Sequence, residues 1–294
     1  MHSFLKTVGF RNIKSRKDVE QLVRLITTQG TERYMTTLGS KNMFAEILLE
    51  VADHVGVALR GEYDEQGKFH MEHYFPYVKG ENVSTNEVVF INKRVDTDAY
   101  TGMCEDYRLG VSLIFYLQNV TDYVSQGEEE ERREYPVMLS ALASEGKILL
   151  PTMSMKEAPV KETVDPSGRT KLLEAARKGD REAMEALTID DIDLYAQISK
   201  RLKKEDIYSI VETTFIPYGS ESDNYTILAQ IESVSECVNR FTGEELYCMD
   251  LRCNELCFPM CISKKDLFGE PKVGRRFRGN VWMQGMVDFG QKQS

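Results

Sequence analysis

Four cysteines near the C-terminus come closest to the spacing of a metal site. Zinc thiolates usually come as Cys-x2-Cys pairs, which place two sulfur atoms on one turn of backbone. Here the spacings are five, four and four residues, and in extended chain the first thiol has the opposite parity to the others. We therefore expect buried thiols that act as small hydrophobic groups, and no metal. The four are Cys248, Cys253, Cys257 and Cys261.

The histidines predict neither a metal pair nor a local catalytic signature. His70 and His73 lie three residues apart in a predicted strand, so their side chains should point to opposite faces. The other two histidines are His2 and His54. No motif of the Ser-His-Asp or Cys-His kind is present, although a dispersed triad stays open. We predict no catalytic residue and no cofactor.

Two acidic runs have simple structural explanations. Asp190, Asp191 and Asp193 fall in the first turn of a predicted helix whose last turn is basic, which complements the helix dipole. The run at 128–131 precedes two arginines and is typical of a solvated loop or helix start.

A stretch rich in glycine and arginine, GEPKVGRRFRGNVWMQG at 269–285, is the strongest candidate for binding. Gly269 and Gly274 have P-loop spacing, but arginines replace the required Lys-Ser/Thr and a strand follows, so a nucleotide site is not expected. The pattern instead predicts a turn into a closing barrel strand. The predicted binding residues are Arg275, Arg276, Arg278 and, for stacking, Trp282.

Charge limits the partners of this stretch. The formal net charge is −10, with 17 basic against 23 acidic residues in 1–150, whereas 264–278 holds six basic against two acidic ones. An acidic chain repels polyanions, so nucleic acid is an unfavourable partner. We expect the arginines to meet an acidic protein surface, on a partner, on the chain's own N-terminal half or across a homodimer.

Length and composition predict two soluble domains. A chain of 294 residues exceeds the usual single-domain size, and 41% hydrophobic residues allow each half its own core. The N-terminus does not resemble a signal peptide, and no apolar stretch approaches the roughly 20 residues of a membrane helix. We therefore expect a cytoplasmic protein with reduced thiols and no membrane contact.

The first half, residues 1–151, predicts an antiparallel sheet with helices. A capping box at Ser15–Asp18 opens a helix that Gly30 ends. Strands follow, with a hairpin tip within 62–69 and a last hairpin turned at 145–147. Periodicity leaves residues 45–53 open between helix and strand.

The second half predicts helices and then a barrel, which makes the fold class α+β. Residues 152–169 have the composition of a linker. Residues 170–205 read as a helical connector of three short helices, the second capped by Asp180. Strands return in 206–294 and suit a small OB-like β-barrel.

Several strings identify a resemblance. LLEAARKGDREAMEALTIDDIDLY, KEDIYSIVETTFIPYG, NRFTGEELYCMDL and GEYDEQGKFHMEHYFPY, with the 269–285 stretch, resemble a DUF3881-like family of uncharacterised proteins from anaerobic Gram-positive bacteria. The resemblance implies a bacterial cytosolic protein and brings no activity or cofactor with it. From the residues we expect a non-enzymatic binding or scaffold protein that acts through protein contacts. The alternatives are single-stranded nucleic-acid binding by the barrel and an enzyme with a site between the domains.

Overall fold

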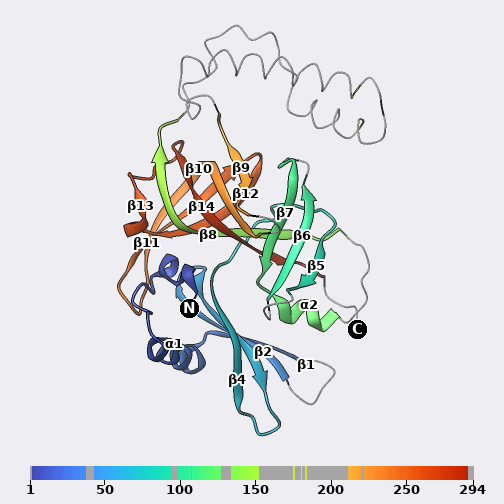
Figure 1. Ribbon diagram of the computed structural model, residues 1–294, viewed down its shortest axis with the longest axis vertical. Helices are drawn as coiled ribbons and strands as arrows, with labels where there is room; N and C mark the ends of the chain where they lie inside the picture. The colour runs from blue at the N-terminus through green and yellow to red at the C-terminus, as the bar shows by residue number, and fades with distance from the viewer. Residues whose placement is uncertain are drawn as a thin grey trace. The chain divides into compact units, whose positions relative to one another are not determined.

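Two β-sheets make up most of the described chain (Figure 1). The structure is a computed structural model that describes residues 2–37, 43–94, 99–106, 108–126, 134–151, 175, 180, 183, 211–219 and 222–290. The predicted linker, most of the predicted connector and both acidic runs lie outside these residues. Within the connector, the Asp180 carboxylate accepts a hydrogen bond from the backbone N–H of Ala183 at 3.3 Å, as its predicted capping role requires.

The smaller sheet is a meander of four antiparallel strands. Residues 45–52 belong to a strand, and their burial on both faces hides the alternation that would have identified it. The predicted helix is confirmed: the Ser15–Asp18 capping box is formed and the helix packs on this sheet. The hairpin tip before Phe69 is also confirmed. The elements are η1 (Ser3–Val8), α1 (Arg16–Gln29), β1 (Glu32–Thr37), β2 (Met43–Ala52), β3 (Val55–Tyr63) and β4 (Phe69–Val78).

The larger sheet has ten strands from both halves of the chain. Its order is β13-β8-β12-β11-β10-β14-β7-β6-β5, and β9 pairs beside this path with β10. The elements are β5 (Phe90–Lys93), β6 (Tyr100–Asp106), β7 (Val111–Leu117), α2 (Val120–Gln126), β8 (Val137–Leu149), β9 (Thr214–Pro217), β10 (Asn224–Val238), β11 (Glu245–Cys253), β12 (Leu256–Ser263), η3 (Lys264–Asp266), β13 (Leu267–Phe268) and β14 (Arg276–Val287).

Five of these strands close into a barrel. The ring runs β8, β12, β11, β10, β14 and back to β8. β8 pairs antiparallel with the whole of β14, from Leu149 opposite Arg276 to Val137 opposite Val287, and parallel with β12. The described fold is therefore mostly β with a closed barrel, but the barrel is not contained in 206–294, because the first half supplies one of its strands.

The predicted hairpin at 145–147 is wrong, because β8 runs straight through it. Gly146 is a strand residue, and a Cβ atom added there would lie 2.2 Å from the ring of Phe277 on the neighbouring strand β14. The glycine therefore makes room for an aromatic ring that packs inside the barrel, and it does not form a turn.

Two hydrophobic cores share the barrel strands. The first fills the barrel and includes Ala141 and Val281. The second lies between the smaller sheet, α1 and the outer face of the barrel, and it takes Leu142 and Trp282 from the same two strands. Alternate residues of β8 and β14 therefore serve different cores, and both faces are buried at Ala141–Leu142 and Val281–Trp282.

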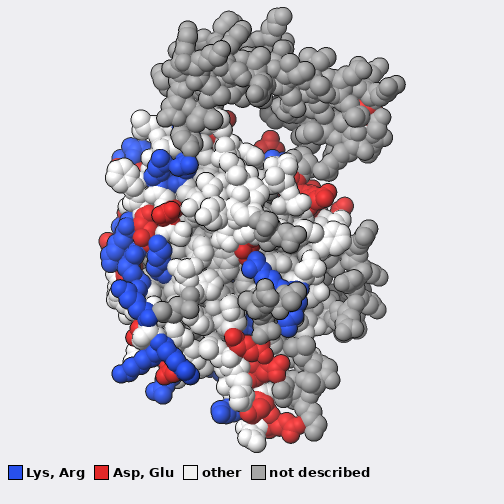
Figure 2. All heavy atoms as spheres, viewed as in Figure 1, with Lys and Arg blue, Asp and Glu red and all other residues white. Residues whose placement is uncertain are grey.

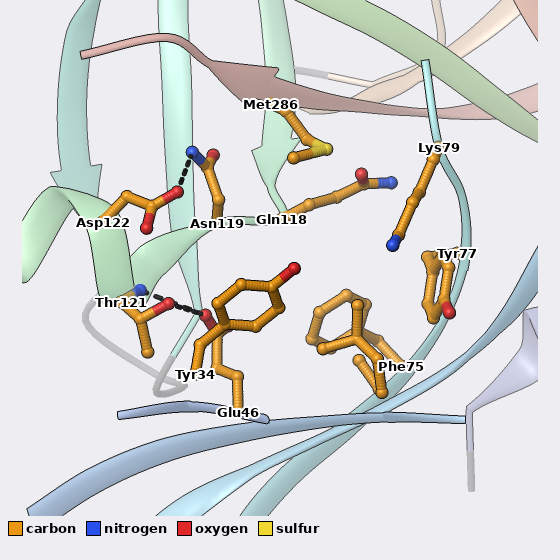
Figure 3. Close-up of a pocket in the computed structure, with 12 residues that line it drawn as sticks. Tyr34, Glu46, Phe75, Tyr77, Lys79, Gln118, Asn119, Thr121, Asp122 and Met286 are labelled. Atoms are coloured by element: carbon orange, nitrogen blue, oxygen red, sulfur yellow. Dashed lines mark hydrogen bonds between the residues drawn. The ribbon is translucent and has the colours of Figure 1, made fainter. Parts of the chain in front are cut away.

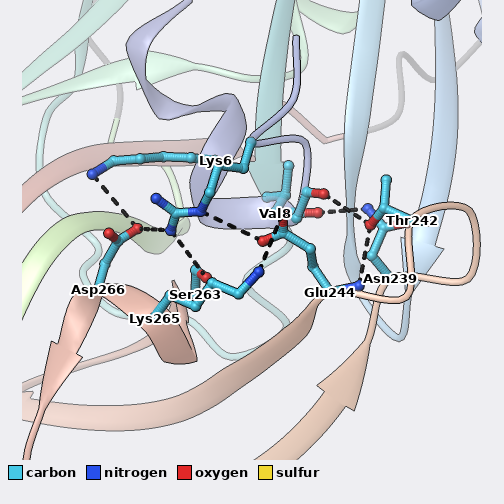
Figure 4. A network of polar contacts seen from close by, with 10 residues as sticks. Lys6, Val8, Asn239, Thr242, Glu244, Ser263, Lys265 and Asp266 are labelled. Atoms are coloured by element: carbon cyan, nitrogen blue, oxygen red, sulfur yellow. Dashed lines mark hydrogen bonds and ion pairs between the residues drawn. The ribbon is translucent and has the colours of Figure 1, made fainter.

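The N-terminal segment docks on the barrel through polar contacts (Figure 4). Arg11 forms an ion pair with Asp266, with 2.6 Å between Nη2 and Oδ2. The side-chain amide of Asn239 donates to the carbonyl oxygen of Val8 at 2.7 Å. These contacts join residues more than two hundred positions apart, so the N-terminus and the barrel belong to one structure.

Two compact units divide the chain differently from the predicted domains. Residues 1–150 and 213–294 form one unit, and residues 151–212 form the other. The predicted boundaries at 151 and 206 fall close to where the chain leaves and re-enters the first unit. The structure joins the predicted domains 1–151 and 206–294, because β8 completes the barrel. Among the described residues, no helix is long and apolar enough to cross a membrane.

Candidate functional site

Two of the four predicted binding residues are buried and bonded within the protein. Arg276 is 5% exposed, and its Nε and Nη2 donate to the carbonyl oxygen of Leu150 at 3.0 and 2.9 Å. Trp282 is also 5% exposed; its indole N–H donates to Asp223 at 2.9 Å, and its ring centroid lies 5.0 Å from that of Tyr116. Neither side chain is placed to meet a partner at the surface.

Of the other two predicted residues, Arg275 directly precedes β14 and Arg278 lies near its start. As predicted, the stretch before them turns into a barrel strand, and Gly269 and Gly274 adopt φ of +93° and +81°. Arg275 Nη1 donates to the carbonyl oxygen of Glu270 at 2.8 Å, which holds the turn closed. The glycines therefore serve backbone conformation, and Arg275 and Arg278 are both half-buried.

Part of the local positive charge is paired with carboxylates of the same chain. Lys and Arg side chains gather along one side of the surface, over β11, β13 and α1 (Figure 2). Within 264–278, however, Lys264 Nζ lies 2.7 Å from Glu236 Oε2, and Lys272 Nζ lies 2.9 Å from Glu270 Oε2. The positive electrostatic field of residues 264–278 is thus weaker than the number of lysines and arginines indicates.

Beside these residues lie the three most exposed large hydrophobic side chains of the described chain. Phe268 is 82% exposed, Leu150 is 72% exposed and Val273 is 67% exposed. They come from β13, from the end of β8 and from the turn before β14. We call this the barrel-end surface: Leu150, Phe268 and Val273, with Lys147 and Arg278.

Strand pairing places the aromatic ring of this surface in one row with two cations. Phe268 of β13 lies opposite Lys147 of β8, and Lys147 lies opposite Arg278 of β14. Directly opposite residues share one face of a sheet, so the three side chains form a row. Phe277, the neighbour of Arg278, points into the barrel core, so the row lies on the outer face.

A cavity of about 70 Å³ lies between the smaller sheet, β7 and α2 (Figure 3). Several of its polar side chains are already bonded to the protein, whereas the buried hydroxyl of Tyr77 has no hydrogen-bond partner among the described residues. Lys79 Nζ contacts both carboxylate oxygens of Glu32 at 2.6 and 2.8 Å, and the amide of Gln118 donates to Gln284 at 2.8 Å. Ligand pockets are usually several hundred Å³ in volume. The cavity therefore gives the enzyme hypothesis little room for a substrate.

A buried ion pair lies at the edge of this cavity. Arg60 is fully buried, and its Nη2 and Nε lie 2.6 and 2.8 Å from the Glu46 carboxylate. Glu46 also accepts hydrogen bonds from the backbone N–H and the hydroxyl of Thr121 in α2, at 3.0 and 2.6 Å. The guanidinium donates further to the Tyr116 hydroxyl at 3.2 Å. The pair therefore joins the smaller sheet to β7 and α2.

The four C-terminal cysteines lie in a hairpin, which overturns the parity argument. β11 and β12 are joined by a two-residue turn, so Cys248 lies directly opposite Cys261. Cys253 and Cys261 are buried as expected, whereas Cys248 is half-buried and Cys257 is exposed. A fifth cysteine, Cys237 on β10, has its sulfur 3.1 Å from that of Cys248. Sequence spacing alone did not reveal this contact.

The expectation that His70 and His73 point to opposite faces is also wrong. The β3–β4 register shifts by one residue between them, so His70 and His73 lie opposite two β3 residues that share a face. His70 is nevertheless exposed and paired with Asp64 at 2.7 Å, whereas His73 packs near the ring of His2. Among the described residues, no three His, Cys, Asp or Glu side chains are grouped so as to hold a metal ion.

Comparison with known proteins gives one match. A family model described as "Domain of unknown function, E. rectale Gene description (DUF3881)" matches residues 5–285. No curated protein and no solved structure matches the chain. The matched range includes the smaller sheet, the larger sheet up to Gly285 of β14, and the whole barrel-end surface.

Proposed function

Because the chain belongs to this DUF3881 family, whose function is unknown, we propose a function from the barrel-end surface. The protein is a non-enzymatic binding or scaffold protein, and it docks a protein partner on Phe268, Leu150 and Val273. The family that the sequence strings resembled is the family whose model matches the chain. The OB-like character of the barrel belongs to the same proposal, because small barrels of this kind bind ligands on their outer strands.

The exposure of three large apolar side chains at one end of the barrel carries the proposal. Exposed hydrophobic residues scattered singly need no explanation, whereas an apolar group rimmed by polar residues is typical of an interaction site. In the row, Lys147 lies directly opposite Phe268, and Arg278 lies beyond Lys147. The partner that fits offers an apolar pocket for the ring and carboxylates around it.

Single-stranded nucleic acid is the second candidate, for one reason. An exposed aromatic ring with cations on the neighbouring strands is the kind of surface on which unpaired bases stack. Phe268 takes the place of Trp282 in this alternative, because Trp282 is buried. The net charge of −10 and the ion pairs within 264–278 weaken phosphate binding, so the protein partner is preferred.

The test compares the variant Phe268→Ser/Val273→Ser with a matched control, Val238→Ser, whose side chain is 52% exposed on β10. Each tagged full chain is cross-linked in its native cells, and the captured proteins are quantified. The main partner is then purified and its Kd measured. Burial of the Phe268 ring in the complex should contribute about 2 kcal/mol, so its loss in the double variant should raise the Kd for the partner roughly 30-fold.

The control variant should keep the partner and its affinity. Equal capture by the double variant and the control would contradict the proposal. A fluorescent 12-mer of oligothymidylate decides the second candidate: micromolar binding that falls steeply with salt and is lost in the double variant would replace the protein partner by nucleic acid.

A further inference from the structure

A second cavity, of about 360 Å³, lies outside the barrel-end surface. We call it the thiol pocket. One wall is the β2–β3 turn with Asp53 and His54, and the opposite wall is the outer face of β10 and β11 with Cys237 and Cys248. Its volume lies within the usual range for small-molecule sites.

The register of the barrel brings the two thiols together. Cys237 lies opposite Leu246, and Cys248 lies opposite Ser235, so the cysteines are diagonal neighbours on one face of the β10–β11 pair. Their sulfur atoms are 3.1 Å apart, and both residues are half-buried. A disulfide needs about 2.05 Å between sulfur atoms, so a small side-chain movement suffices to form one.

We propose that Cys237 and Cys248 form a thiol-modification site, at which a small cationic disulfide entering the thiol pocket converts the pair into a protein disulfide. A protein thiolate attacks one sulfur of the reagent, forms a mixed disulfide and releases one small thiol. The other protein thiolate then attacks the protein sulfur, forms the Cys237–Cys248 bond and releases the second small thiol. Two protein thiols are oxidised, and the reagent disulfide is reduced to two thiols that carry the two protons.

The charge of the pocket selects the reagent class. Three carboxylates that line it, Asp53, Glu81 and Glu236, are largely exposed. A fourth, Asp250, also lines it; the cations set against the four are Lys79, Lys264, which pairs with Glu236, and, when protonated, His54. An ammonium-bearing disulfide is therefore attracted and a carboxylate-bearing one repelled. For doubly charged reagents the difference is about tenfold in rate at low salt.

The pKa values of the two thiols differ from that of a nucleophilic catalytic cysteine, whose pKa is usually lowered. Contact with Cys248, together with burial, raises the pKa of the Cys237 thiol well above its usual range. For Cys248 the contact with Cys237 lowers the pKa, but the contact with Cys261 and burial raise it more. The pair is therefore mostly protonated near neutral pH, and the proximity of the second thiol drives closure after the first exchange.

The test uses the reduced full chain at pH 8 with two reagents, cystamine and 3,3′-dithiodipropionate. Peptide mass mapping should show a Cys237–Cys248 disulfide with no reagent adduct retained on either cysteine. The disulfide should form about tenfold faster with cystamine than with 3,3′-dithiodipropionate, after each rate is divided by the rate at which the same reagent reacts with free cysteine. The advantage should shrink in high salt. Cys257→Ser, which removes an exposed thiol elsewhere, should behave as wild type.

Cys237→Ser and Cys248→Ala should block this disulfide and leave a mixed adduct on the remaining pocket thiol, with circular dichroism showing that each variant is folded. The proposal would be overturned if Cys257 reacted while the pair stayed reduced. Equal corrected rates for the two reagents would overturn its charge selectivity.

Discussion

Replacement of Arg60 by methionine should be among the most destabilising single changes in the protein. The arginine is fully buried, and the change leaves the Glu46 carboxylate, itself 3% exposed, without its cation. Breaking a buried ion pair by removing one partner costs about 3–5 kcal/mol, because the remaining charge stays desolvated. A folded domain is stable by only about 5–15 kcal/mol, so the loss is a large part of the total.

A double-mutant cycle separates the pair from the packing of its methylene groups. Glu46→Leu alone should also destabilise strongly, since it removes the acceptor for Arg60 and for both groups of Thr121. The double variant Arg60→Met/Glu46→Leu leaves no buried charge of the pair. Its cost should therefore fall below the sum of the single costs by about 2–3 kcal/mol.

Urea unfolding followed by tryptophan fluorescence is the assay. Trp282 is the sole tryptophan, and its ring lies beside Tyr116, which the Arg60 guanidinium contacts. With a slope of about 3 kcal/mol per molar urea, a loss of 4 kcal/mol lowers the midpoint by more than about 1 M. A shift below about 0.3 M, or strictly additive single costs, would refute the argument that the pair anchors the smaller sheet to β7 and α2.

Three further results are expected. Burial lowers the pKa of His2 to about 4, so the unfolded chain binds this proton at a higher pH than the folded chain. Stability should therefore fall by up to about 3 kcal/mol as pH drops from about 6.5 toward 4. His2→Gln should remove this part of the change in urea midpoint between pH 7 and 4.5. Gly146→Ala should cost about 1–3 kcal/mol through the clash with Phe277, seen as a lower thermal midpoint, and an unchanged midpoint would mean that the ring moves freely. Cleavage at a protease site inserted after residue 160 should give two fragments that co-elute until denaturant is added, because β8 stays paired with β14. Fragments that separate in native buffer would contradict this.

Local signals predicted local structure well. The capping box at Ser15 and the hairpin tip before Phe69 depend on residues within a few positions of each other, and both are present. Gly146 misled the prediction because its partner, Phe277, comes from a strand more than a hundred residues away. A glycine that fits a turn and a glycine that accommodates a distant ring look identical in sequence.

The candidate site was located only in part. The basic stretch does lie at the end of the barrel, but Trp282 alternates with barrel-core residues and is buried on the other face. Alternation shows that two faces differ, and it does not show which face meets solvent. Phe268 was missed, because its local sequence does not distinguish it from Phe277, an aromatic residue of the same basic segment that is buried.

The cysteines show where sequence reasoning could have gone further and where it had to stop. Asn254 and Glu255, both at positive φ, join two apolar runs as a two-residue hairpin turn. Asparagine at such a position is a known hairpin signal, and reading it would have placed Cys248 opposite Cys261. The contact with Cys237 needs the register of a second hairpin with a longer loop. The facing wall of the thiol pocket comes from the β2–β3 turn in the first half of the chain, which only tertiary packing brings there.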